Sequence, residues 1–131
     1  MKEFAIRLTK GADLKESIEN ICKNNCIDTA IICSGVGCIS SLNLRMAKAK
    51  SYLEVNDDFE IVSLTGTISK GKAHIHMAVS NELGECFGGH LQKGCLINTT
   101  CELVLGILED YESIRTFDAQ TGYDEIEFRK K

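Results

Sequence analysis

Residues 73–91 read AHIHMAVSNELGECFGGHL and contain all three histidines of this 131-residue chain. Apolar and polar residues alternate up to a short polar segment with glycine, and a second β-prone run follows it, which predicts a β-hairpin. His74 and His76 are two residues apart, so a strand carries both imidazoles on one face. His90 lies on the second predicted strand. The stretch therefore predicts a hairpin that gathers every histidine of the chain.

The length of the turn decides whether the three rings share a face. A three-residue loop over 82–84, with Gly84 in the left-handed region, pairs His76 with His90 and brings all three imidazoles together. A two-residue loop shifts the register by one residue and turns His90 to the opposite face. A bulge at residues 88–89 also changes the parity. Convergence of the rings is therefore conditional on the turn.

Three convergent imidazoles are a ligand set for a transition metal. We predict that His74, His76 and His90 bind Zn²⁺ or another divalent transition metal, because nickel, iron and copper also accept imidazole. Three neutral histidines leave the fourth position of a tetrahedral zinc ion open to water, as in catalytic rather than closed structural sites. The alternative is that these are buried or edge histidines with ordinary hydrogen bonds.

An open zinc site suggests water activation, since zinc lowers the pKa of a bound water to about 7. Glu102 stands alone among apolar neighbours. We predict it as the catalytic residue that accepts the proton of this water or orients a ligand histidine. The alternative for Glu102 is a carboxylate at a rim or a subunit interface. Ser34 and Arg45 are further polar candidates for substrate contact.

The composition is that of an ordinary globular domain, with 44% hydrophobic and 26% charged residues, and the length fits one domain over residues 1–131. No apolar run is as long as a membrane span, and Met1 to Lys10 alternates and carries charges, unlike a signal peptide. We therefore expect no membrane association and a cytoplasmic location. The seven cysteines, an odd number, are expected to be reduced thiols.

The charge balance does not indicate nucleic-acid binding. The formal net charge is −4, and no cluster of lysines or arginines is present beyond the C-terminal residues 129–131. Proteins that hold DNA through its phosphates usually show a basic face.

The remaining pattern predicts an α+β fold. An alternating strand over residues 3–9 precedes a helix that Asp13 caps, with Glu16 three residues later. A short apolar strand over 29–33 leads into Ser34-Gly35-Val36-Gly37, which we interpret as a tight turn or a close backbone contact rather than a phosphate-binding loop. Strands dominate from there to the C-terminus. We expect a single compact domain with a central, mainly antiparallel sheet and a flanking N-terminal helix.

Several short segments occur together along the chain, in this order: Ser34–Gly37, Phe59–Gly66, Gly71–His76, Gly88–Leu91, Gly94-Cys95, Glu102 and Thr121-Gly122. Their combined order resembles the PPC (plant and prokaryote conserved) domain in its stand-alone prokaryotic form. The resemblance implies one domain with a central antiparallel sheet, assembled as a homotrimer. It also implies the histidine trio of the prokaryotic members.

Three functions follow from these observations and the resemblance. The first is a metal-binding protein, with an enzymatic role left open. The second is a DNA-binding or regulatory protein with a structural metal site, by analogy with plant relatives that carry AT-hook motifs. An AT-hook needs an Arg-Gly-Arg-Pro core, and this chain has neither proline nor such a stretch. The third is a sensor in which clefts of the trimer bind a small molecule.

Overall fold

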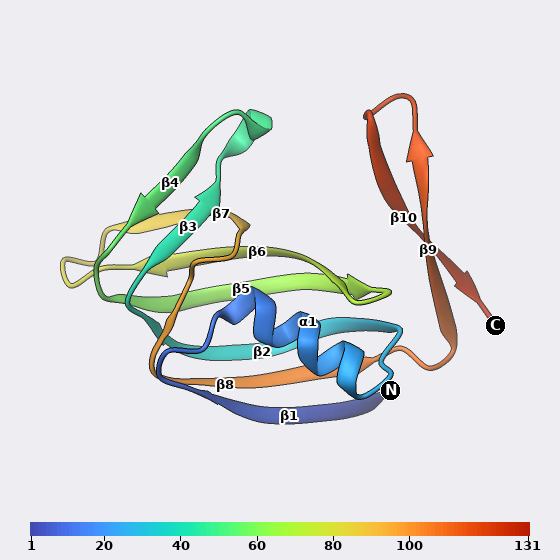
Figure 1. Ribbon diagram of the computed structural model, residues 1–131, viewed down its shortest axis with the longest axis horizontal. Coiled ribbons are helices and arrows are strands. Elements are labelled where there is room, and N and C mark those ends of the chain that lie inside the picture. The colour runs from blue at the N-terminus through green and yellow to red at the C-terminus, as the bar shows by residue number, and fades with distance from the viewer.

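The computed structural model describes all residues from 1 to 131, which form one α-helix, a short 3-10 turn and ten strands (Figure 1). In chain order they are β1 (Lys2–Thr9), α1 (Leu14–Asn24), β2 (Thr29–Ile39), β3 (Leu42–Arg45), η1 (Ala47–Ala49), β4 (Tyr52–Val55), β5 (Phe59–Ser69), β6 (Lys72–Ser80), β7 (Cys86–Leu91), β8 (Ile97–Ile107), β9 (Tyr111–Asp118) and β10 (Tyr123–Lys130).

Eight of the strands form one sheet in the order β1-β8-β2-β5-β6-β7-β3-β4, and every neighbouring pair is antiparallel. The helix α1 lies across one face of this sheet, whereas β9 and β10 form a separate hairpin that stands beside it (Figure 1). The predicted α+β fold, with an antiparallel sheet and a flanking N-terminal helix, is confirmed. The single helix is too short and too polar to cross a membrane.

The helix begins where the sequence predicts it. The Asp13 carboxylate accepts a hydrogen bond from the backbone N–H of Glu16 at 2.9 Å, which satisfies one of the free donors of the first turn. Leu14, Ile18 and Cys22 recur at helical spacing and are fully buried. The burial of this stripe fixes the helix on the sheet.

The segment Ser34-Gly35-Val36-Gly37 forms no tight turn. It continues β2, whose pairing with β8 shifts register on both sides of it. A Cβ atom on Gly37 would overlap the backbone of Thr100 on β8. Of the two interpretations of this segment, the close backbone contact is therefore the one that the structure shows.

Burial on β6 determines which way the histidines point. Ile75, Met77 and Val79 are buried, and they alternate with His74 and His76, which are exposed on the other face. Full burial of such an apolar side chain is worth roughly 1.5–3 kcal/mol, so a one-residue slip would expose three core residues and bury two imidazoles. The core thus fixes the orientation of the site.

Buried hydroxyl groups anchor the β9–β10 hairpin to the sheet. The Ser113 hydroxyl lies 2.8 Å from the Thr29 hydroxyl and 2.6 Å from that of Ser69, and all three residues are buried. Thr29 also donates to the Asp28 carboxylate at 3.0 Å. These bonds join the base of the hairpin to β2 and to the end of β5, and they hold it beside the sheet.

Candidate metal centre

The turn between β6 and β7 has the three-residue form that brings the histidines together. Gly84 has a φ of 76°, and its N–H donates to the Asn81 carbonyl at 3.0 Å. The Asn81 side-chain oxygen accepts from the N–H groups of Leu83 and Glu85, each at 3.0 Å. The ladder that starts from this turn runs without a bulge to the pair formed by His76 and His90.

The three imidazoles lie as close neighbours. Their ring centroids are 5.2 Å apart for His74 and His76, 5.1 Å for His74 and His90, and 5.5 Å for His76 and His90. One nitrogen from each ring lies within 4.8 Å of the other two. Ligand nitrogens on a tetrahedral zinc ion are about 3.3 Å apart, given Zn–N bonds of about 2.0–2.1 Å. Small rotations of the rings close this difference, so the residues fit a metal ion.

The surroundings keep two of these imidazoles neutral. Burial, with the Arg45 guanidinium and the other two rings, lowers the pKa of His90 to about 4. Partial desolvation by its neighbours also lowers the pKa of His74, although part of the side chain is exposed, and the charges of His76 and Arg115 lower it further against the opposing charge of Glu125. A neutral imidazole has a free lone pair, which is the form that binds a metal ion.

Arg45 lies at the edge of the cluster. It is the cross-strand partner of His90 through the β3–β7 pair, and its Nη2 lies 3.4 Å from the Nδ1 of His90. Because a guanidinium group only donates hydrogen bonds, this long contact places a positive charge against an imidazole nitrogen. The sequence analysis named Arg45 as a candidate for substrate contact, and the structure brings it to the histidines.

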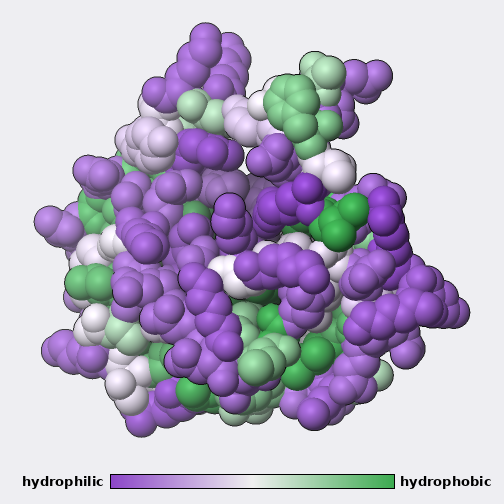
Figure 2. Space-filling model, turned by 45° about the vertical axis from the view of Figure 1, so that its right-hand side comes forward, coloured by the Kyte–Doolittle hydropathy of each residue, from purple (hydrophilic) through white to green (hydrophobic).

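Two adjoining cavities meet at the cluster. One, of about 670 Å³, lies between α1, the start of β6 and β10, and the other, of about 530 Å³, lies under the loop from β3 to β4. His74, His90, Arg45 and Tyr123 line both. The face turned toward the viewer in Figure 2 is hollowed between two upper lobes, and mainly hydrophilic side chains surround the hollow. Because His74 and His90 line both cavities and His76 lines the smaller one, the histidines are accessible to a small molecule.

The other predicted residues lie elsewhere. Glu102 is exposed on β8 and pairs with Arg7 and Val36. Two strands, β2 and β5, separate β8 from β6, which corresponds to roughly 14 Å across the sheet. Ser34 lies on β2 and lines neither cavity. Within one chain Glu102 is thus too far away to act directly on a ligand at the histidines.

Arg115 also belongs to the site, although the sequence alone gives no sign of it. It lies on β9, lines the larger cavity, and is one of the charges that lower the pKa of His74. Nothing local marks it, because its neighbours Ile114 and Thr116 belong to an ordinary alternating strand. Only the position of the hairpin beside the sheet brings this arginine to the site.

Comparisons with known proteins agree with the fold. A protein from Salmonella enterica, described as hypothetical, is 32% identical with a TM-score of 0.95, over 99% of this chain and 94% of that chain. A protein from Archaeoglobus fulgidus, described as metal-containing, is 32% identical with a TM-score of 0.79, over 95% of this chain and 92% of that chain.

Among curated proteins, the bifunctional protein GlmU of Synechococcus sp. (strain JA-3-3Ab) is 34% identical over 130 residues, or 99% of this chain. The chain spans only about a fifth (21%) of the length of that relative. The family model described as the Plants and Prokaryotes Conserved (PCC) domain matches residues 1–109, which include all the segments of the predicted motif order except Thr121-Gly122. The chain therefore belongs to the Plants and Prokaryotes Conserved domain family.

Proposed function

We propose that this protein binds a divalent transition metal ion, zinc in the first instance, through His74, His76 and His90. The observation that carries the proposal is the convergence of one nitrogen from each ring to within 4.8 Å of the others. The neutral state of His74 and His90 at pH 7 supports it, since no proton has to leave these rings before a metal binds. The description of the Archaeoglobus fulgidus relative as metal-containing also supports it.

The proposed site has three protein ligands, which leaves coordination positions open. A zinc ion held in this way would act as a Lewis acid that coordinates a water molecule or an anionic oxygen atom of a ligand. The three histidines would hold the ion where the two cavities adjoin, and the Arg45 guanidinium contacts one of them, His90. The proposed function is therefore metal-dependent binding or turnover of a small molecule, rather than a buried structural zinc.

Metal analysis of the protein tests this proposal. Protein purified without an affinity tag is analysed by mass spectrometry for zinc, nickel, iron and copper, then stripped with a chelator and titrated with zinc against a chromophoric competitor. We expect one metal ion per chain and recovery of one ion per chain after stripping. Protein that is free of metal and takes none up on titration contradicts the proposal.

The proposal extends to a homotrimeric assembly, which the family resemblance implies. Exposed apolar side chains on adjacent strands of the sheet, Val36 on β2 and Val62 on β5, support an interface on that face. Light scattering coupled to size-exclusion chromatography measures the mass directly, and a chain of 14.4 kDa should give about three times that value. Duplex DNA is not part of the proposal, because the net charge of −4 opposes it.

A further inference from the structure

Positive charge concentrates around the histidines, against the overall sign of the chain. The chain has 15 lysines and arginines and 19 acidic residues. Six of the basic residues line the two cavities at the cluster, but only three of the acidic residues do. The basic residues are Lys15, Arg45, Lys48, Lys72, Lys93 and Arg115, and the acidic residues are Glu19, Asp124 and Glu125. The site is therefore a positive region in an acidic protein, which favours an anionic occupant.

The guanidinium group of Arg115 has a hydrogen-bond donor for which the chain supplies no acceptor. Its Nε atom is buried and has no hydrogen-bond partner, although the side chain lines the larger cavity. Buried polar groups are nearly always hydrogen-bonded, and no residue of the chain supplies an acceptor for this nitrogen, so an acceptor on an occupant of the cavity would satisfy the guanidinium. A carboxylate or phosphate oxygen matches the planar, forked donors of arginine.

Arg45 would also be stabilised by an anionic ligand once a metal ion is bound. Three neutral imidazoles leave the full double positive charge of a divalent ion uncompensated, and the Arg45 guanidinium lies only 3.4 Å from one of these rings. An ion bound to the same ring would lie close to this guanidinium, and like charges at short separations repel each other. An anionic group in contact with both Arg45 and the ion removes this repulsion, whereas a neutral ligand does not.

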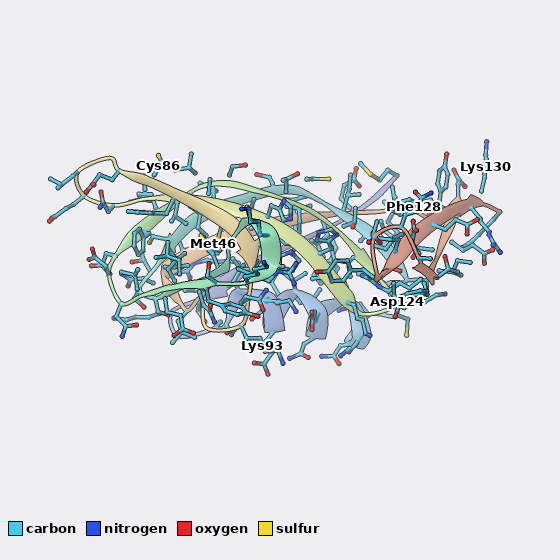
Figure 3. The ribbon with its side chains drawn as sticks, turned by 90° about the horizontal axis from the view of Figure 1, so that it is seen from above. Met46, Cys86, Lys93, Asp124, Phe128 and Lys130 are labelled. Carbon is cyan, nitrogen blue, oxygen red and sulfur yellow. The ribbon has the colours of Figure 1, made fainter.

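The large apolar side chains of the larger cavity lie on β10. This strand lines the cavity with Tyr123, Ile126 and Phe128 and also with the acidic Asp124 and Glu125, whereas the basic residues line it from α1, from the main sheet with the loop after β7, and from β9. Figure 3 places Asp124 and Phe128 on the hairpin side and Met46 on the sheet side. The cavity, of about 670 Å³, is in the range of small-molecule sites. Its occupant therefore has an anionic end near the two arginines and a ring or an apolar part against Tyr123, Ile126 and Phe128.

We propose that this cavity binds a small organic anion, with its carboxylate or phosphate group held between Arg45, Arg115 and the metal centre. This inference rests on the proposed metal site only for the highest affinity, which requires the bound ion. Binding to the two arginines alone remains when the metal is removed, so the two proposals fail separately.

Isothermal titration calorimetry with three probes tests the inference. Inorganic phosphate, phenyl phosphate and benzoate are titrated into zinc-loaded protein and into chelator-treated protein. We expect saturable binding in both forms, at least tenfold tighter with zinc, and tighter for phenyl phosphate than for inorganic phosphate because the ring reaches β10. Which of phenyl phosphate and benzoate binds more tightly identifies the anionic group.

A matched pair of variants on the same hairpin assigns the binding to Arg115. Arg115→Met is expected to weaken binding of the preferred probe by at least tenfold. Arg129→Met removes an exposed guanidinium that pairs with Glu127 and lines neither cavity, and it should bind as the wild type does. Thermal melts check that both variants fold. If Arg115→Met does not fold, Arg45→Met serves as the second test of anion binding.

The outcomes separate the two proposals. Wild-type protein that binds none of the three anions in either form overturns the inference, and so does an Arg115→Met variant that binds them as the wild type does. A wild type that takes up no zinc yet binds an anion through Arg115 overturns the metal site and supports the anion site. Arg115→Met should still take up one zinc ion per chain, because Arg115 is not a ligand.

Discussion

His76 lies directly opposite His90 across the β6–β7 ladder, and the Asn81 to Gly84 turn sets this pairing. The pairing places His90 on the face that already carries His74 and His76, because directly opposed residues of an antiparallel pair point to the same side. The proposed metal site therefore depends on the length of one loop and on the burial of the residues between the histidines.

His76→Ala should abolish stoichiometric zinc binding and leave the fold intact. His76 is exposed, so its loss removes a ligand without leaving a hole in the core. Zinc content and thermal melts measure the two effects. Cys86→Ser, at an exposed thiol on β7 of the same hairpin, is the control, because free thiols also bind zinc. Full zinc occupancy in His76→Ala, or loss of zinc in Cys86→Ser, would show that the ligands are wrongly assigned.

Arg45→Met should raise the affinity for zinc in buffers without oxyanions. The substitution removes a positive charge next to His90, and relief of this repulsion is expected to be on the order of tenfold in the dissociation constant. Competition with a chromophoric chelator measures the change. Arg7→Met removes an exposed arginine on β1 that hydrogen-bonds Thr100, and its affinity should equal that of the wild type. A weaker affinity in Arg45→Met would argue that Arg45 supports the metal site instead of opposing it.

Gly66→Ala should cost more stability than Gly84→Ala and should also weaken zinc binding. A Cβ atom at Gly66 would overlap the carbonyl oxygen of His74, so β6 has to move. Gly84 has open space around it, and alanine there bears only the strain of a left-handed backbone, about 1–2 kcal/mol. Denaturant unfolding and zinc titration of both variants check this order. Equal losses of stability in Gly66→Ala and Gly84→Ala would show that β5 and β6 can accommodate a side chain where Gly66 contacts β6.

Ser113→Ala should loosen the β9–β10 hairpin. Ser113 is buried, and its removal leaves the hydroxyls of Thr29 and Ser69 short of a partner, at a cost of about 1–3 kcal/mol. Hydrogen exchange should become faster in residues 111–130, which also carry Arg115. Ser63→Ala, at an exposed serine on β5, should exchange as the wild type does. Unchanged protection of the hairpin in Ser113→Ala would mean that other contacts hold it.

Protonation of Asp28 should lower the free energy of unfolding at acid pH. Burial by itself raises the pKa of Asp28, but hydrogen bonds from Lys70 and Thr29, with the charge of Lys70, outweigh it and hold this pKa below 3.8. A carboxyl group whose pKa is lowered on folding stabilises the protein above its unfolded pKa, and this stabilisation is lost as the pH falls through 3.8 and below.

Asp28→Asn should therefore flatten the decline of the unfolding free energy below about pH 4.5. Urea unfolding at a series of pH values measures the decline. Asp57→Asn, at an exposed carboxylate outside the ion pairs of the chain, should decline as the wild type does. An identical slope for Asp28→Asn and the wild type would remove Asp28 as the cause.

The sequence by itself determined the local features of the site. Alternation on β6 predicted that His74 and His76 share a face, and the glycine at position 84 was compatible with the turn that adds His90. The capped helix and the strands beyond it were also readable, because capping, turn chemistry and period-two burial depend on residues close in sequence.

The order of the strands was decided by the tertiary structure alone. It placed Glu102 three strands away from β6 and brought Arg45 against His90 through the β3–β7 pair. It also set the last two strands apart as a hairpin that carries Arg115 to the cavity. The physical reason is that strand order depends on the burial of the whole core and on contacts between residues far apart in the chain. No short segment encodes such contacts.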